Sequence, residues 1–103
     1  MTADQFHYDL DQTRGVLTLH GELDEVASVE LREVLTKVTD EFTTGLAIDL
    51  EHVTFMPSPA IGVLASSREK ARRNGVTVTF VAPAGTIAAR LLTICGLEYA
   101  EAI

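Results

Sequence analysis

The stretch from Gly45 to Leu64 constrains the fold of this chain more than any other segment. It opens with Gly45–Leu50, an apolar run that is too short for a surface helix and is typical of a central strand covered on both faces. After a short connection, Pro57-Ser58-Pro59 precedes apolar residues at helical spacing. A buried strand that leads into a helix is half of a βαβ unit, so the sequence predicts an α/β fold with a mainly parallel sheet.

The N-terminal part of the chain predicts a hairpin followed by a helix. Phe6–Leu10 and Val16–His20 alternate apolar and polar residues on either side of a short turn, which indicates a β-hairpin with its first strand antiparallel at a sheet edge. Gly21-Glu22-Leu23-Asp24 then leads into apolar residues at helical spacing. The buried face of this helix is predicted to carry Val26, Leu31, Val34, Leu35 and Val38.

The C-terminal half predicts two more helices with a strand between them. The second helix should run from about Pro59 to Asn74, and the β-branched run Val76–Val81 should form a strand. A third helix ends near Gly96, and its apolar side is predicted to carry Ile87, Leu91, Ile94 and Cys95. Together the segments predict a single domain over residues 1–103, with a mixed, mainly parallel sheet of four to five strands and three to four helices.

The composition is that of a soluble globular protein, with 47% hydrophobic and 22% charged residues. No apolar run approaches the roughly 18 to 20 residues that span a bilayer, and the acidic, polar N-terminus does not resemble a signal peptide. The single cysteine, Cys95, excludes an internal disulfide and a cysteine-rich metal site, and is expected to be a small core residue. These features predict a cytoplasmic protein.

The net charge of −7 is concentrated in the first half of the chain. An acidic chain lacks the broad basic surface that nucleic-acid binding needs, so no nucleic-acid partner is expected. Arg68, Lys70, Arg72 and Arg73 form one short basic cluster. Cations favour the last turn of a helix, and Asn74-Gly75 directly afterwards is typical of a C-cap, so the cluster has a structural explanation.

Ser58 has two interpretations at the start of the second helix. As the N-cap, its side-chain oxygen would accept a hydrogen bond from the N–H of Ala60 or Ile61, with Pro59 at the first helical position. As a phosphate acceptor, it would use the unpaired N–H groups and the positive end of the helix dipole, which favour an anion. The sequence is consistent with both roles.

Other polar residues do not assemble into a reaction centre. His7, His20 and His52 lie on separate predicted elements, so no metal site is expected. Asp49, at the end of the predicted central strand, is expected to be structural, because no nucleophile–base pair can be assembled around it. No glycine-rich phosphate loop occurs, and the sequence predicts neither a catalytic residue nor a cofactor.

The order and spacing of several segments resemble the STAS domain, in particular the small single-domain anti-sigma factor antagonists. The resemblance covers residues 6 to 99 and rests on Gly21-Glu22-Leu23-Asp24, Ile48-Asp49-Leu50, Phe55-Met56, Ser58, Ile61-Gly62-Val63-Leu64, Gly75 and Leu91-Leu92 to Gly96-Leu97. It implies a binding module that sequesters an anti-sigma factor, often a serine kinase of the GHKL type, and so frees a sigma factor. It places Ser58 at the position that such a kinase modifies to switch the antagonist off.

The resemblance also implies a partner-binding rim that includes Asp24, Pro57, Ser58, Pro59, Ala60 and Ile61. No enzyme activity is expected because no catalytic constellation is visible, and no membrane insertion is expected because no apolar run is long enough. The chain is expected to be a monomer or weak dimer. Pro57-Ser58-Pro59-Ala60 departs from the family pattern, in which Asp-Ser-Ser or Asp-Ser-Thr precedes a glycine. A second reading therefore stays open: a constitutive accessory subunit of a lipid-transport ATPase complex or a stress-signalling assembly.

Overall fold

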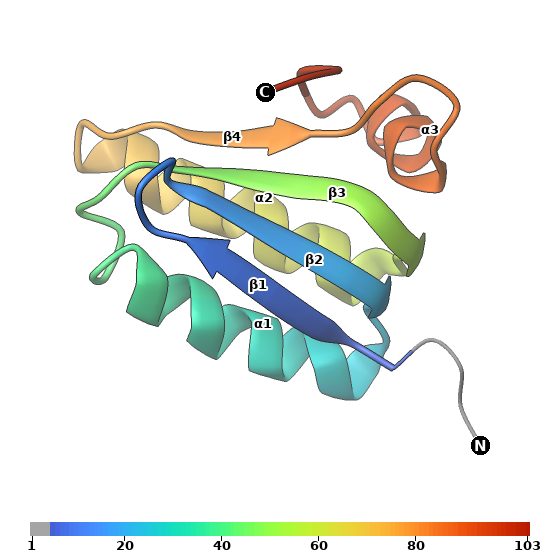
Figure 1. The fold of residues 1–103 in the computed structure, drawn as a ribbon, viewed down its shortest axis with the longest axis horizontal. Helices are drawn as coiled ribbons and strands as arrows, with labels where there is room; N and C mark the ends of the chain where they lie inside the picture. Colours follow the sequence, from blue (N-terminus) through green and yellow to red (C-terminus); the bar gives the residue numbers. More distant parts are fainter. Residues whose placement is uncertain (1–4) are drawn as a thin grey trace.

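The computed structural model describes residues 5–103, which form a four-stranded sheet and three helices (Figure 1). In chain order the elements are β1 (His7–Asp11), β2 (Val16–Glu22), α1 (Glu25–Val38), β3 (Leu46–Phe55), α2 (Ser58–Arg73), β4 (Val78–Val81) and α3 (Ile87–Ile94). Residues 1–4, part of the N-terminus that the sequence predicts is not a signal peptide, lie outside the described residues.

The sheet has the order β1-β2-β3-β4, with β1 antiparallel to β2 and the other neighbours parallel. The predicted mixed, mainly parallel sheet with an antiparallel edge is therefore confirmed. Both crossovers, through α1 and through α2, step in the same direction along the sheet. Because such crossovers share one hand, both helices lie on the same face, as Figure 1 shows.

The main core lies between this face of the sheet and the two helices. Leu17 and Leu19 on β2 and Ile48 and Leu50 on β3 are fully buried and belong to one cluster with residues of α1 and α2. Residues that alternate with them on β3, such as Asp49, are only half-buried. The prediction that the central strand is covered on both faces is therefore wrong, because both crossover helices occupy one side. The strand also extends to Phe55, so Asp49 lies within it rather than at its end.

The buried faces of α1 and α3 differ from those that spacing predicted. On α1, Leu31, Val34 and Leu35 are buried as expected, but Val26 is 79% exposed and Ala27 is buried instead. At 3.6 residues per turn, Val26 lies about 100° around the helix from Ala27, on the side away from this core.

On α3 the small residues face inward. Ala88, Ala89 and Leu92 are buried, whereas Ile87 and Ile94 are exposed and Leu91 is half-buried. Cys95 is exposed at the C-cap of α3, so its expected place in the core is wrong. Gly96, with φ of +72°, follows directly and ends the helix as predicted.

Three histidines from separate strands stack in a row on the open face of the sheet. His7 pairs with His20 across β1 and β2, and His20 pairs with His52 across β2 and β3. The ring centroids are 4.5 and 5.0 Å apart, with an interplanar angle of 3° in each pair. Asp9 Oδ2 lies 3.1 Å from His20 Nε2. Because the three histidines lie far apart in the sequence, their contact was not predicted. It arises from the register of the strands.

Candidate partner-binding site

The ends of β2 and β3 bring the two predicted partner-binding segments to one edge of the molecule. Glu22 pairs with Phe55, and the Leu23 N–H donates to the Phe55 carbonyl at 2.8 Å. Gly21, with φ of +88°, sits at a register shift directly before this pairing, a backbone geometry that glycine adopts without strain. Because the carboxyl ends of these parallel strands are neighbours, the segments that begin with Asp24 and Pro57 emerge side by side.

Asp24 is the N-cap of α1. Its Oδ1 accepts a hydrogen bond from the Ala27 N–H at 2.9 Å, and its carbonyl accepts one from the Ser28 hydroxyl at 2.8 Å. The side chain is exposed, so the carboxylate also faces solvent at this edge. The capping role that the sequence left open is confirmed, and its role in partner binding stays a prediction.

Replacement of the cap should destabilise the domain by a small, measurable amount. We expect Asp24→Ala to lower the free energy of unfolding by about 1 kcal/mol, because the Ala27 N–H loses its acceptor and the positive end of the α1 dipole loses a negative charge. Asp24→Ser should restore most of the loss, since serine also caps helices. Urea unfolding followed by far-UV circular dichroism measures both changes. Equal stability of Asp24→Ala and wild type would contradict the capping role.

Ser58 is not the N-cap of α2, contrary to the sequence prediction. The cap is Pro57, with φ of −75° and ψ of 174°, and no side chain makes a capping hydrogen bond. Ser58 is the first helical residue and Pro59 the second. The helix can begin one residue earlier because the Pro57 carbonyl accepts from the N–H groups of Ala60 and Ile61, at 3.0 and 3.2 Å.

This arrangement leaves fewer backbone donors for an anion than the sequence suggested. Pro59 has no N–H, and the N–H groups of Ala60 and Ile61 are taken by Pro57. Only the Ser58 N–H remains among the first four helical residues. A phosphate on Ser58 would therefore be stabilised mainly by the helix dipole, which contributes about 0.3–1 kcal/mol at an exposed end.

The residues at this edge form a surface that we call the rim, made of Asp24, Val26, Phe55, Pro57, Ser58, Pro59 and Ile61. Ser58 and Pro59 are exposed, while Pro57 and Ile61 are half-buried. Ala60 is fully buried, so it supports the rim from beneath instead of facing a partner.

Sequence reasoning missed two apolar members of the rim. Phe55 is 50% exposed and Val26 is 79% exposed, at the end of β3 and in the first turn of α1. Val26 was predicted to lie on the buried face of the first helix, and Phe55 was named only among the residues that carry the STAS resemblance. An exposed aromatic ring beside an exposed hydroxyl is typical of a protein-binding surface.

The side chains of the rim are suited to binding another protein. Within residues 5–103 no group of His, Cys, Asp or Glu side chains could hold a metal ion. In the same part of the chain, no helix combines the length and apolar character needed to cross a membrane. A carboxylate, a hydroxyl and apolar side chains at the ends of secondary-structure elements can recognise another protein.

Comparison with curated proteins identifies named relatives. The chain is similar to "Anti-sigma-F factor antagonist RsfB" of Mycobacterium tuberculosis, from strains CDC 1551 / Oshkosh and ATCC 25618 / H37Rv. Each is 33% identical over 84 residues, which cover 81% of this chain and 66% of the relative. The match therefore spans just under two thirds of the length of these relatives.

Solved structures show the same fold. An anti-sigma factor antagonist from Mycobacterium paratuberculosis has a TM-score of 0.81 at 22% identity, over 98% of this chain and 90% of its own. SpoIIAA in its unphosphorylated form has a TM-score of 0.67 at 20% identity, over 90% and 82%. The phosphorylated form of the Bacillus protein has a TM-score of 0.66 at 19% identity, over 90% and 85%. At these identities the likeness concerns the fold.

The family model for the STAS domain matches residues 7–100, from the start of β1 to the segment after α3. That range includes all four strands and all three helices described above. The chain therefore belongs to the STAS domain family.

Proposed function

We propose that this STAS protein is an anti-sigma factor antagonist, which binds an anti-sigma factor through the rim and so releases a sigma factor for transcription. The observation that carries the proposal is the exposed rim at the start of α2, where Ser58, Pro59 and half of Phe55 face solvent. The names of the relatives support this role over that of an accessory transport or scaffold subunit. Such a protein works in the cytoplasm, as its composition predicts.

The mechanism is competition for a surface. The anti-sigma factor docks on the rim, with Phe55 and Val26 as apolar contacts and Asp24 as a polar one, and can no longer hold its sigma factor. Buried aromatic residues contribute much of the affinity at interfaces of this kind. No bond is made or broken by this chain, so its activity depends on affinity and concentration alone.

We further propose that the anti-sigma factor is a serine kinase of the GHKL type and that Ser58 is its substrate. The Ser58 hydroxyl is exposed and makes no hydrogen bond within residues 5–103, so it is free to accept the γ-phosphoryl group of ATP, with ADP as the leaving group. SpoIIAA, which has the same fold, exists in a phosphorylated form, so the fold accommodates this group. The prolines on both sides of Ser58 fix its backbone, and the kinase has to accept that conformation.

A capture experiment followed by mass analysis tests both parts. The tagged chain is used to recover partners from the source cells, and the recovered complex is incubated with ATP and Mg²⁺. We expect wild type to gain the mass of one phosphate and Ser58→Ala to gain none. Ser66→Ala is the matched control, because Ser66 is an exposed serine on the same helix, and it should be modified like wild type.

The two parts of the proposal fail differently. A captured anti-sigma factor that never adds phosphate would remove the switch at Ser58 and leave the antagonist role. Capture of a permease or transport ATPase in place of any anti-sigma factor would overturn the antagonist role itself.

A further inference from the structure

All the histidines of the chain lie together on the open face of the sheet, the face that α1 and α2 leave uncovered. The chain has three, and His7, His20 and His52 stack with ring centroids 4.5 and 5.0 Å apart. We call them the histidine row. Histidine is the side chain whose charge ordinarily changes between pH 5 and 8. The positive charge that histidines can add to this protein near neutral pH therefore appears at one place.

The histidine row lies beside the rim. His20 pairs with His52, and two residues further along β2 Glu22 pairs with Phe55. At about 3.3 Å per residue, this step places the Phe55 pair about 7 Å from the row. Met56, the next residue, is buried in the core, so Phe55 projects to the open face, as the histidines do. The aromatic ring of the rim and the histidine row therefore belong to one continuous surface.

The strands around the histidine row carry only negative charge when the histidines are neutral. The four strands, all within residues 5–103, contain no lysine or arginine. They contain five carboxylates: Asp9, Asp11, Glu22, Asp49 and Glu51. Asp9 Oδ2 lies 3.1 Å from His20 Nε2. Glu51 Oε1 lies 3.9 Å from His52 Nε2. Neutral histidines leave the strands with a charge of −5, and protonation of all three changes it to −2.

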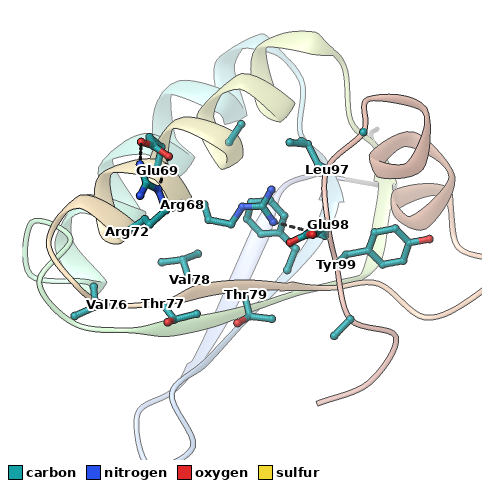
Figure 2. Close-up of a pocket in the computed structure, with 14 residues that line it drawn as sticks. Arg68, Glu69, Arg72, Val76, Thr77, Val78, Thr79, Leu97, Glu98 and Tyr99 are labelled. Atoms are coloured by element: carbon teal, nitrogen blue, oxygen red, sulfur yellow. Dashed lines mark hydrogen bonds and ion pairs between the residues drawn. The ribbon is translucent and has the colours of Figure 1, made fainter.

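The basic cluster of α2 does not offset this charge. Lys70, Arg72 and Arg73 lie in the last turn of α2, as the sequence predicted, and α2 covers the opposite face of the sheet (Figure 1). Arg68 and Arg72 line a groove of about 1080 Å³ along β4, at the sheet edge opposite β1 (Figure 2). Glu69 pairs with Arg72 and Arg73, and the hydrogen bond from Arg72 holds the pKa of the Glu69 carboxyl below its usual value. Near neutral pH, the open face therefore changes its charge through the histidine row.

A partner that covers Phe55 also reaches the histidine row. A standard interface takes about 800 Å² from each protein, which is a patch with a radius of about 16 Å. Centred on Phe55, such a patch includes the row, which begins about 7 Å away. Covering a neutral imidazole buries an aromatic ring, whereas covering a protonated one takes a charge out of water. The protonation state of the row therefore affects the affinity for any partner of this size.

We propose that the histidine row makes binding at the rim dependent on pH, so that the anti-sigma factor binds the neutral row and is released as the row becomes protonated. The inference rests on the proposed function, because it concerns the same partner. The partner surface over the row carries Lys or Arg side chains, which the five carboxylates attract and which the ring of Phe55 can hold. Protonation repels these cations and adds a cost of desolvation, so both effects lower the affinity in acid.

Isothermal titration calorimetry with the purified anti-sigma factor from the capture experiment tests the proposal. We expect the dissociation constant of wild type to rise at least about tenfold from pH 7.5 to pH 5.5, because histidine is largely neutral at the first pH and largely protonated at the second. At pH 6.0, the measured heat should differ between buffers of different ionisation enthalpy, because binding releases protons from the row. Far-UV circular dichroism of the chain alone at each pH measures its fold separately.

Histidine variants separate the row from titrating groups of the partner. In the double variant His20→Gln and His52→Gln, the ratio of the dissociation constants at pH 5.5 and pH 7.5 should fall at least about fivefold below that of wild type. His7→Gln is the matched control, because His7 lies on β1, at the end of the row furthest from Phe55. It should keep most of the pH dependence.

The outcomes distinguish this inference from the proposed function. Equal ratios for wild type and the double variant, or tighter binding of wild type at pH 5.5 than at pH 7.5, would overturn the inference and leave the antagonist role in place. An equal fall in His7→Gln and the double variant would also overturn it, because the effect would not depend on the distance from Phe55. Absence of binding at pH 7.5 would overturn the antagonist role, and this inference with it.

Discussion

Ser58→Glu is expected to weaken binding of the captured anti-sigma factor by about 10²–10³-fold, a loss of about 3–4 kcal/mol. The substitution puts a permanent negative charge at the start of α2, beside the exposed ring of Phe55 and near the carboxylate of Asp24. A partner that covers this surface would have to desolvate the new charge against apolar and acidic neighbours. Isothermal titration calorimetry with the purified partner measures the change.

The fold should tolerate the new charge at Ser58. A carboxylate in the first turn of a helix interacts favourably with the dipole, so the free energy of unfolding should change by less than about 1 kcal/mol. Ser66→Glu is the matched control, because it adds the same charge to an exposed position two turns further along the same helix. It should bind like wild type. Equal losses for Ser58→Glu and Ser66→Glu would point to a general charge effect and contradict a specific role for the rim.

The sequence predicted the topology because its signals were local and mutually consistent. The alternation in Phe6–Leu10 and Val16–His20, the apolar run Gly45–Leu50 and the proline-marked start of α2 each specify one element, and short connections limit how they can be joined. The STAS resemblance located the rim residues before their neighbours were known. Ser58 and Asp24 do emerge side by side at the sheet edge.

The spacing of residues along the sequence could not predict contacts between residues that are distant in the chain. Periodicity says which residues share a helix face but not what covers that face, so Ile94 was expected in the core and is exposed. Val26 was also expected in the core, but it lies about 140° around α1 from Leu31 and is outside the buried stripe. The histidine row and the groove both depend on strand register and on where residues 96–100 return to β4. The left-handed turn after α1 could not be predicted from the sequence. Asp40, Glu41 and Phe42 have φ of 50°, 56° and 65°, and none of them is the glycine that usually marks such a backbone.

The buried face of α1 gives the sharpest test of the core. We expect Leu31→Ala to lower the free energy of unfolding by about 2–5 kcal/mol, because Leu31 is fully buried between α1 and the sheet and its removal leaves a cavity. That is a large share of the roughly 5–15 kcal/mol that stabilises a domain of this kind. Because the chain has no tryptophan, far-UV circular dichroism in urea is the suitable measurement.

Val34 and Val26, on the same helix, provide the control for this test, because both were predicted to lie on its buried face. Val34→Ala should lower the free energy of unfolding by about 1.5–3 kcal/mol, because Val34 is only 8% exposed. Val26→Ala should change it by no more than about 0.5 kcal/mol, because 79% of Val26 already contacts water and alanine favours the helix. Equal losses at the two positions would mean that α1 is rotated so that Val26 also faces the core. In that case Val26 would leave the rim, and the apolar contact proposed there would rest on Phe55 alone.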